Sequence, residues 1–237
     1  MTSIGTTASV LAQNPVFGVA VTLLAYEFGR WAQRRCGGWP LANPVLIAIV
    51  VIVAGLEVCG ISYDTYLKGG GLIQFLLGPA TVALALPIYA NTGRIRGAAV
   101  GIAAGVTVGA TVACASAVGI AWVLGAPDDI VRSIAPKSVT TPIAIGISQE
   151  IGGHPSLTAV LVITSGIIGA MLSGPLYDWI GVRDWEARGL ATGIASHGIG
   201  TAQMLSVNET AGAFAGLAIG LTGLFTAVVL PFAAYLL

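Results

Sequence analysis

Charged residues are scarce in this chain. Asp, Glu, Lys and Arg make up 8% of its 237 residues, whereas 56% are hydrophobic and the mean hydropathy is +0.90. Soluble domains carry about a quarter charged residues, so this composition could not cover the surface of a soluble globule. It predicts an all-α polytopic membrane protein. The formal net charge is zero, which gives no sign of a nucleic-acid partner.

Cysteine and catalytic motifs are also lacking. The three cysteines, Cys36, Cys59 and Cys114, are widely spaced and form no CxxC pair, which argues against disulfides and against a zinc site. The chain contains no HExxH, GxSxG or phosphate-cradling Gly-Lys pattern, and no acidic cluster with metal-ligand spacing. We therefore expect no enzymatic activity, no metal and no cofactor. Residues 1–13 lack the basic segment of a cleavable signal peptide, so we expect the first helix to stay.

Long apolar runs are abundant and interrupted. About 20 apolar residues suffice to cross a bilayer, and seven such runs are present. The predicted runs are 14–32, 43–61, 72–90, 97–124, 155–180, 189–206 and 211–236. Residues 62–71 are expected to be a polar connector, and Arg132 to Lys137 belong to a second, charged one. The run 138–153 is short for a crossing at about 1.5 Å per helical residue.

The distribution of Lys and Arg predicts how the short run behaves. If all eight segments crossed, the ten basic residues would divide evenly between the two sides. If 138–153 enters and leaves on one side, seven arginines share one face and Lys68, Arg132 and Lys137 share the other. The positive-inside rule favours the asymmetric arrangement. We therefore predict seven to eight hydrophobic segments in a transporter-like bundle with broken or re-entrant helices.

A weak internal repeat accompanies these segments. Thr81, Thr141 and Thr201 lie sixty residues apart, and each follows a small residue three positions earlier. Chance matches are common in a chain with 33 glycines, so a true repeat and coincidence both stay open. The sequence predicts a single integral membrane domain over 1–237, with 1–124 and 125–237 as possible repeat halves.

Three interrupted segments, near residues 78, 138 and 196, combine hydroxyls with glycine or proline. A break inside a membrane leaves backbone donors free, and the start of a half-helix carries partial positive charge that suits an anion. The simpler alternative is that these hydroxyls only satisfy carbonyls at kinks. The candidate substrate-binding residues are Gly78, Pro79, Thr81, Ser138, Thr140, Thr141, Pro142, Ser196, His197, Gly198, Gly200 and Thr201.

Ionisable residues within apolar segments are the candidates for proton coupling. His197 stands out because its ordinary pKa, near 6.5, allows protonation at physiological pH; the alternative is a neutral histidine bonded across helices. Glu57 is a second candidate, or it extends to the membrane interface. Glu150 is a third, or it lies at the watery end of its segment.

Four motifs resemble the LrgB/CidB family of bacterial membrane proteins, also called the YohK or antiholin-like family. They are FLLGPATVALA at 75–85, PKSVTTPIA at 136–144, PSLTAV at 155–160 and ASHGIGTA at 195–202. The resemblance implies a multi-pass protein of the bacterial inner membrane that works with a small LrgA/CidA-like partner. It implies either transport of small monocarboxylates (pyruvate, lactate, glycolate or glycerate) or regulation of murein hydrolases and cell lysis.

We favour the transporter at this stage, because polar residues concentrate at helix breaks instead of along helix faces. The expected function is proton-coupled secondary transport of a small carboxylate by a homo-oligomer, most simply a dimer. The alternative is a holin- or antiholin-like regulator of murein hydrolase activity and lysis.

Overall fold

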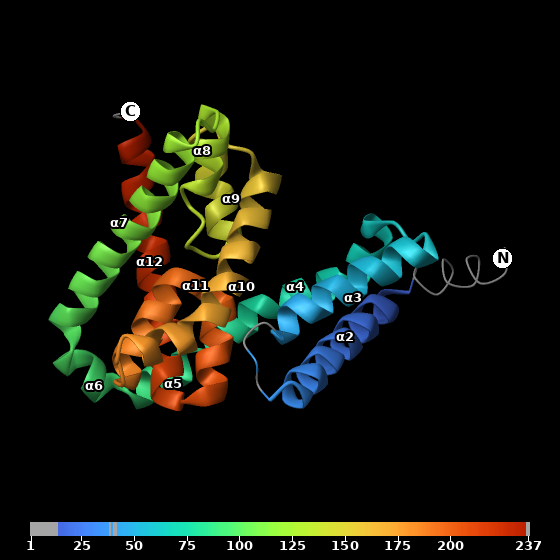
Figure 1. Ribbon diagram of the computed structural model, residues 1–237, viewed down its shortest axis with the longest axis horizontal. Helices are drawn as coiled ribbons and strands as arrows, with labels where there is room; N and C mark the ends of the chain where they lie inside the picture. The colour runs from blue at the N-terminus through green and yellow to red at the C-terminus, as the bar shows by residue number, and fades with distance from the viewer. Residues whose placement is uncertain (1–13, 38, 40–41, 236–237) are drawn as a thin grey trace. The chain divides into compact units, whose positions relative to one another are not determined.

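The computed structural model describes residues 14–37, 39 and 42–235, and within these ranges the regular elements are helices (Figure 1). Contacts divide the chain into two compact units, residues 1–83 and residues 84–237. Each unit is described by itself. The predicted repeat halves, 1–124 and 125–237, stay a prediction.

Unit 1 consists of α2 (Pro15–Arg35), α3 (Pro44–Cys59) and α4 (Tyr63–Ala83). The first two helices start in the same way: the side chains of Asn14 and Asn43 accept hydrogen bonds from backbone amides of the following turn. Asparagine is favoured at this capping position. Helix α2 packs on both α3 and α4, and Thr22 on α2 is 2.7 Å from the hydroxyl of Tyr66 on α4.

Two expectations for this region are wrong. From Tyr63 onward, the connector predicted at 62–71 lies inside α4, whose first turn holds Asp64. A negative charge there stabilises a helix N-terminus. The break predicted at Gly78 and Pro79 is also not present, because α4 continues through both to Ala83. A single proline removes one backbone donor, and a helix of 21 residues tolerates that loss.

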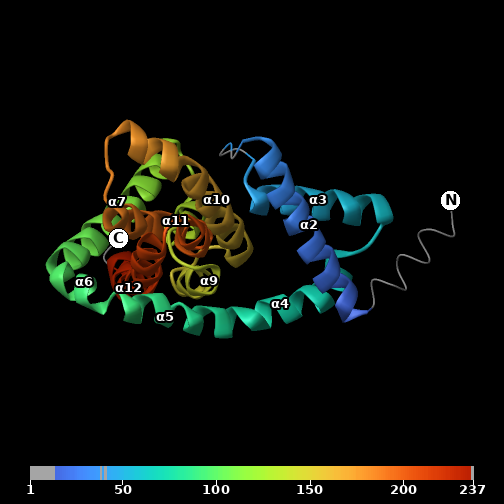
Figure 2. The ribbon, with the colours of Figure 1, turned by 90° about the horizontal axis from the view of Figure 1, so that it is seen from below.

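Unit 2 contains the remaining eight described helices. Their bounds are α5 (Ala85–Ala90), α6 (Thr92–Gly97), α7 (Ala99–Val123), α8 (Asp128–Ile134), α9 (Thr141–Glu150), α10 (Pro155–Trp179), α11 (Trp185–Val207) and α12 (Glu209–Tyr235). Helix α11 lies at the centre and contacts α7, α10 and α12 (Figure 2). This arrangement places the middle of α11 inside the unit.

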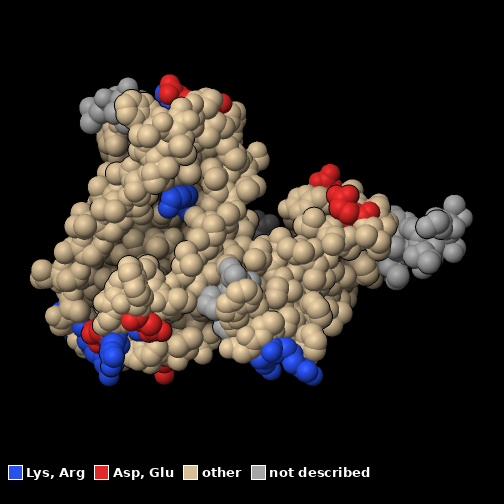
Figure 3. Space-filling view, viewed as in Figure 1, with Lys and Arg blue, Asp and Glu red and all other residues tan. Residues whose placement is uncertain are grey.

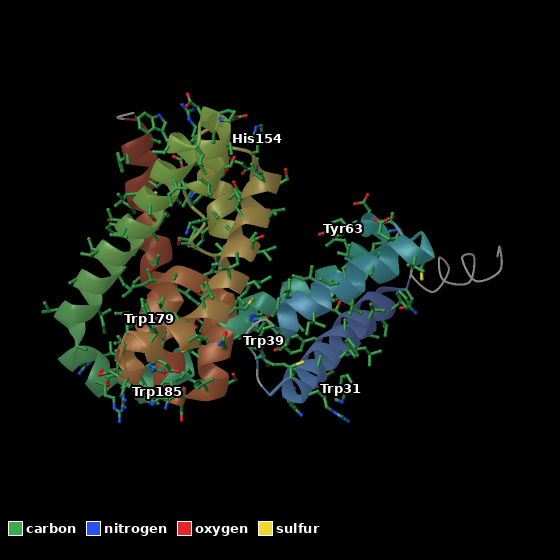
Figure 4. The ribbon with its side chains drawn as sticks, viewed as in Figure 1. Trp31, Trp39, Tyr63, His154, Trp179 and Trp185 are labelled. Atoms are coloured by element: carbon green, nitrogen blue, oxygen red, sulfur yellow. The ribbon has the colours of Figure 1, made fainter. Side chains whose placement is uncertain are left out.

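Charged side chains of unit 2 lie at its two ends. One end, here called the arginine end, carries Arg94, Arg96, Arg183 and Arg188 around the starts of α11 and α12; Arg94 donates to Thr210 across 3.1 Å. The opposite end, the histidine end, carries Asp129 and His154. Figure 4 shows Trp179 and Trp185 toward the arginine end and His154 at the other. Charged side chains gather at both ends, with one isolated basic patch between them (Figure 3).

Four helical stretches are long and apolar enough to cross a membrane. They are Tyr63–Ala90, Ala99–Val123, Pro155–Trp179 and Glu209–Ala234, and Pro44–Cys59 is a shorter apolar helix. Together with the broken helices described below, they confirm the prediction of an all-α polytopic membrane protein.

Small residues set the packing at the centre of unit 2. A Cβ added at Gly193 of α11 would lie 2.8 Å from the Cα of Ala215 on α12, so only glycine allows this approach. Next to it, Ile102 and Val106 of α7, Ile194 of α11 and the fully buried Phe214 of α12 form one core cluster. Membrane helices rely on such close contact, because lipid supplies no hydrophobic drive for their association.

Candidate functional site

Residues 128–154 form a hairpin that leaves the histidine end and returns to it. Helix α8 and the turns after it lead inward to Thr140, and α9 leads back to Gly152 and Gly153. The N–H of His154 donates to Ser133 Oγ across 2.7 Å, so the two ends of the hairpin lie together. This geometry confirms the re-entrant segment predicted at 138–153. We call 128–154 the first hairpin and 137–141 its tip.

A cluster of hydrogen bonds closes the base of the first hairpin. His154 Nε2 is 2.8 Å from Asp129 Oδ2, and both side chains are about half exposed. Thr158 of α10 donates to the carbonyl of Ser133 and to Ser148 Oγ, at 2.9 and 2.7 Å. The hydrogen bond from His154 lowers the pKa of Asp129 below its ordinary value, because it stabilises the ionised carboxylate.

Helix α11 is a second hairpin, broken at His197. The backbone of His197 has φ 38° and ψ −131°, which is not helical. A positive φ is uncommon outside glycine and costs about 1–3 kcal/mol. The interruption predicted at 196–201 is therefore confirmed. We call α11 the second hairpin and Ser196, His197 and Gly198 its tip.

The two arms of α11 run in opposite directions. Positions 189 and 193 of the first arm face Ala211 and Ala215 of α12 in parallel order, whereas Leu205 of the second arm faces Gly212. The chain therefore starts and ends α11 at the arginine end. Gly200 permits the reversal, since a Cβ there would lie 2.6 Å from Ser196 and Thr192 atoms. The expectation that 189–206 is a full-length run toward the other side is wrong; the segment turns back halfway.

The two tips meet on one stretch of α10. Ser165 Oγ lies 3.0 Å from the carbonyl oxygen of Lys137 and 2.9 Å from that of Val162. His197 Nε2 lies 3.0 Å from the same Val162 carbonyl oxygen. Hairpins that enter unit 2 from opposite ends thus bring Ser138–Thr141 and Ser196–Gly198 to one place. Sequence reasoning missed Ser165, because nothing in the sequence around it distinguishes it from a serine on a helix surface.

Lys137 is the charged group at this place. It is partly buried, and its ammonium donates to Ser138 Oγ across 3.3 Å. Within the described part of unit 2, no carboxylate lies within 4 Å of its nitrogen. The sequence assigned Lys137 to a charged connector at the membrane surface, whereas the hairpin carries it inward to the tip. Its position just before the hydroxyl-rich run was the signal that could have found it.

The start of α9 adds uncharged donors beside Lys137. Thr140 occupies the capping position and its side chain makes no capping hydrogen bond. Thr140 and Thr141 are partly exposed and Pro142 is exposed, whereas Ser138 is buried. The first backbone amides of a helix have no partner within it and attract anions. The tip therefore presents an ammonium, hydroxyls and a helix N-terminus together.

His197 faces away from solvent. Its side chain is buried. Because a carbonyl oxygen can only accept a hydrogen bond, the contact with Val162 requires a proton on Nε2. In the neutral imidazole Nδ1 is then the acceptor. This cross-helix bond is the alternative that the sequence left open for His197, and a role in proton coupling stays a prediction. The hydroxyl of Thr201 donates to the backbone carbonyl of His197 across 2.9 Å, so this carbonyl at the break has a hydrogen-bond partner.

The other candidate residues lie elsewhere. Gly78 and Pro79 are exposed on α4 of unit 1, and the side chain of Thr81 lies outside the described residues. Glu57 is exposed on α3 of unit 1. Glu150 is exposed at the last turn of α9, at the histidine end, about 14 Å of helix away from Thr141. In unit 2 the converging candidates are therefore those near residues 138 and 197.

Comparison with known proteins gives a consistent result over nearly the whole chain. A family model described as the LrgB-like family matches residues 22–236. A holin-like protein CidB of Staphylococcus epidermidis is 34% identical over 216 residues, covering 91% of this chain and 94% of the relative. An antiholin-like protein LrgB of Bacillus mycoides is 32% identical over 218 residues, covering 92% and 95%. No solved structure matches the chain significantly.

Proposed function

The chain belongs to the LrgB-like family, and from this premise and the two converging tips we propose that it transports a small monocarboxylate across the membrane. The observation that supports the proposal most is the meeting of two re-entrant hairpins on α10, at Val162 and Ser165. Secondary transporters place their solute sites at interrupted helices, where irregular backbone lines a cavity.

The charges at the first tip favour a single carboxylate. Lys137 supplies one full positive charge, and the N-terminus of α9 adds about half a charge. One ammonium pairs with one carboxylate, whereas the second carboxylate of a dianion would have no cation beside it among the described residues of the tip. Ser138, Thr140 and Thr141 can hydrogen-bond the carboxylate and a neighbouring oxo or hydroxyl oxygen. Pyruvate, lactate, glycolate and glycerate share this chemistry.

Uptake into proteoliposomes tests the site through Lys137→Gln. The protein should accumulate labelled pyruvate, lactate or glycolate, and the variant should raise KM by roughly 10- to 100-fold, since a hydrogen bond to a charged group contributes about 1.5–3 kcal/mol. Lys137→Arg keeps the charge and should retain part of the affinity. Lys68→Gln is the matched control, because Lys68 is exposed on α4 of unit 1.

Two results would contradict the proposal. Flat uptake by the unmodified protein across the panel, with and without a pH gradient, argues against transport of these solutes. Equal KM values for Lys137→Gln and Lys68→Gln argue that the site lies away from the first tip.

The names of the relatives favour a second function, a holin- or antiholin-like regulator of murein hydrolases and lysis. Such a protein would act through oligomerisation and membrane permeability in the bacterial inner membrane, with a small LrgA/CidA-like partner. This function needs helix surfaces more than a polar tip. If the protein acts in this way, the double variant Thr140→Val with Thr141→Val should leave autolysis of the cells unchanged. If autolysis instead depends on carboxylate flux, the same variant should lose both uptake and the effect on autolysis.

A further inference from the structure

Polar side chains follow the interface between α10 and the first arm of α11. Arg188, Thr192 and Ser196 are spaced four residues apart, so they share one face of α11. Tyr177 of α10 meets this face: its hydroxyl is 2.9 Å from Thr192 Oγ1, and the Arg188 guanidinium lies 5.8 Å from its ring. This row starts at the arginine end and stops at the second tip.

Ser196 has an unexplained polar group. Its side chain is 1% exposed, and Oγ has no hydrogen-bond partner among the described residues. The hydroxyl points at α10, where Gly169 leaves no room for a methyl group between them. Buried polar groups are nearly always hydrogen-bonded, to protein or to an internal water. A water molecule that bonds this hydroxyl must therefore lie on a side away from Gly169.

The row ends at the imidazole of His197. His197 contacts Gly166, one turn along α10 from Gly169, so Ser196 and His197 lie against the same face of α10. Since Nε2–H is held by the Val162 carbonyl, only Nδ1 can take up a further proton. His197 is thus the terminus of a row of groups that both donate and accept.

We propose that the hydroxyls of Tyr177, Thr192 and Ser196, with water between them, conduct protons from the arginine end to His197. The inference rests on the proposed transport and identifies its coupling route. Each hydroxyl oxygen accepts one proton and passes its own to the next acceptor, and His197 Nδ1 gains the last one. Side chains four residues apart on a helix have Cβ atoms about 5–6 Å apart, a gap that one water molecule bridges.

Few other charged groups face this row. Asp178 and Arg188 form an ion pair at its outer end, where Asp178 is 71% exposed and can collect protons from water. Lys137 is the cation at its inner end. Cys114 of α7 packs against the first hairpin instead, and α12 contributes no titratable side chain between Glu209 and Tyr235. The side chains of the row between its two charged ends are therefore neutral hydroxyls.

Proteoliposome assays separate proton coupling from solute binding. Uptake driven by a pH gradient needs the proton route, whereas equilibrium exchange of labelled solute needs only the site. Ser196→Ala and Thr192→Val should lower gradient-driven uptake at least tenfold. Thr192 lies outside the two tips, so Thr192→Val should leave exchange unchanged. Ser196→Ala should not impair folding, because its hydroxyl has no partner to lose. Thr192→Ser should keep the uptake, and Ser173→Ala is the matched control, since Ser173 Oγ bonds within its own helix.

Three outcomes decide the inference. Normal gradient-driven uptake in Ser196→Ala and Thr192→Val overturns it, as does an equal loss in Ser173→Ala. If the unmodified protein exchanges no solute, the proposed transport fails and a labelling test decides the route alone. In a variant without native cysteines, a small water-soluble thiol reagent should modify Ser196→Cys and not Ser173→Cys; no reaction at Ser196→Cys overturns a hydrated route.

Discussion

Gly166→Ala should displace the His197 ring while leaving residue 197 itself unchanged. A Cβ at position 166 would lie 2.6 Å from Cε1 and Nε2 of the His197 ring, where real Cβ atoms essentially never approach closer than 3.0 Å. To reach an ordinary contact of 3.4 Å the ring must retreat by about 0.8 Å. The 3.0 Å bond from Nε2 to the Val162 carbonyl oxygen then lengthens beyond hydrogen-bond range.

The cost follows from what the retreat leaves behind. The substitution gains up to about 1 kcal/mol of helix propensity, because alanine replaces glycine within α10. It loses the bond and leaves a buried imidazole N–H unpartnered, which costs about 1–3 kcal/mol, whereas the Val162 carbonyl keeps its bond from Ser165. We therefore expect Gly166→Ala to be less stable, by about 1–3 kcal/mol, than an alanine substitution at a helix glycine with open space around it. Gradient-driven uptake should fall with it if His197 carries the coupling proton.

Gly119→Ala in the interior of α7 is the matched control. No atom lies within 4 Å of a Cβ added at Gly119, so this variant should gain the helix propensity without a steric cost. Thermal unfolding of both variants in detergent, followed by circular dichroism, gives the comparison. The reasoning is refuted if Gly166→Ala and Gly119→Ala have the same melting temperature, or if the histidine resonances of the two variants coincide in NMR spectra.

Two further predictions concern the base of the first hairpin and the α11–α12 contact. The hydrogen bond from His154 lowers the folded pKa of Asp129, so this bond should hold at neutral pH and be lost as the pH falls below the ordinary carboxyl range, near 4. The protection factor of the Gly153 amide against hydrogen exchange should then fall, and Asp129→Asn should make that factor low at every pH. Gly193→Ala should lower the melting temperature by the equivalent of about 1–3 kcal/mol, because its Cβ would clash with the Ala215 backbone. Gly220→Ala has open space around its Cβ and should melt like the unmodified protein. Equal melting temperatures for the two variants would show that α12 shifts freely.

The helices of unit 2 could be predicted from the sequence because apolar run length and glycine or proline breaks are local signals. The short run at 138–153 was recognised as re-entrant from the asymmetry of Lys and Arg, which reports sidedness directly. The same signal could not find the fold-back of α11, since the chain has no basic residue after Arg188. In unit 1, proline in α4 was read as a break, although a helix can lose one donor and continue.

The candidate site was predicted in part, and its misses have one cause. Hydroxyls near 138 and 196 were found because such residues are unusual in apolar segments. Lys137 was missed because its charge resembled that of a surface connector, and only the depth of the tip reveals otherwise. Ser165 and Val162 could not be found at all. Their role depends on which carbonyls two separate hairpins bring to one face of α10, and that is a tertiary property.

The backbone of His197 bears on the choice between the two functions. A residue with φ 38° costs about 1–3 kcal/mol unless its surroundings hold it. Here the Val162 bond, the Thr201 bond to its own carbonyl, and the space left at Gly166 all hold it. A protein that acted only through adhesive helix surfaces would gain nothing from this arrangement, and an unbroken α11 would be more stable. Backbone strain that is held by two hydrogen bonds and by the space at Gly166, where two hairpins meet, favours a site with a specific task. Solute transport is the task that Lys137 and the hydroxyls of the first tip fit.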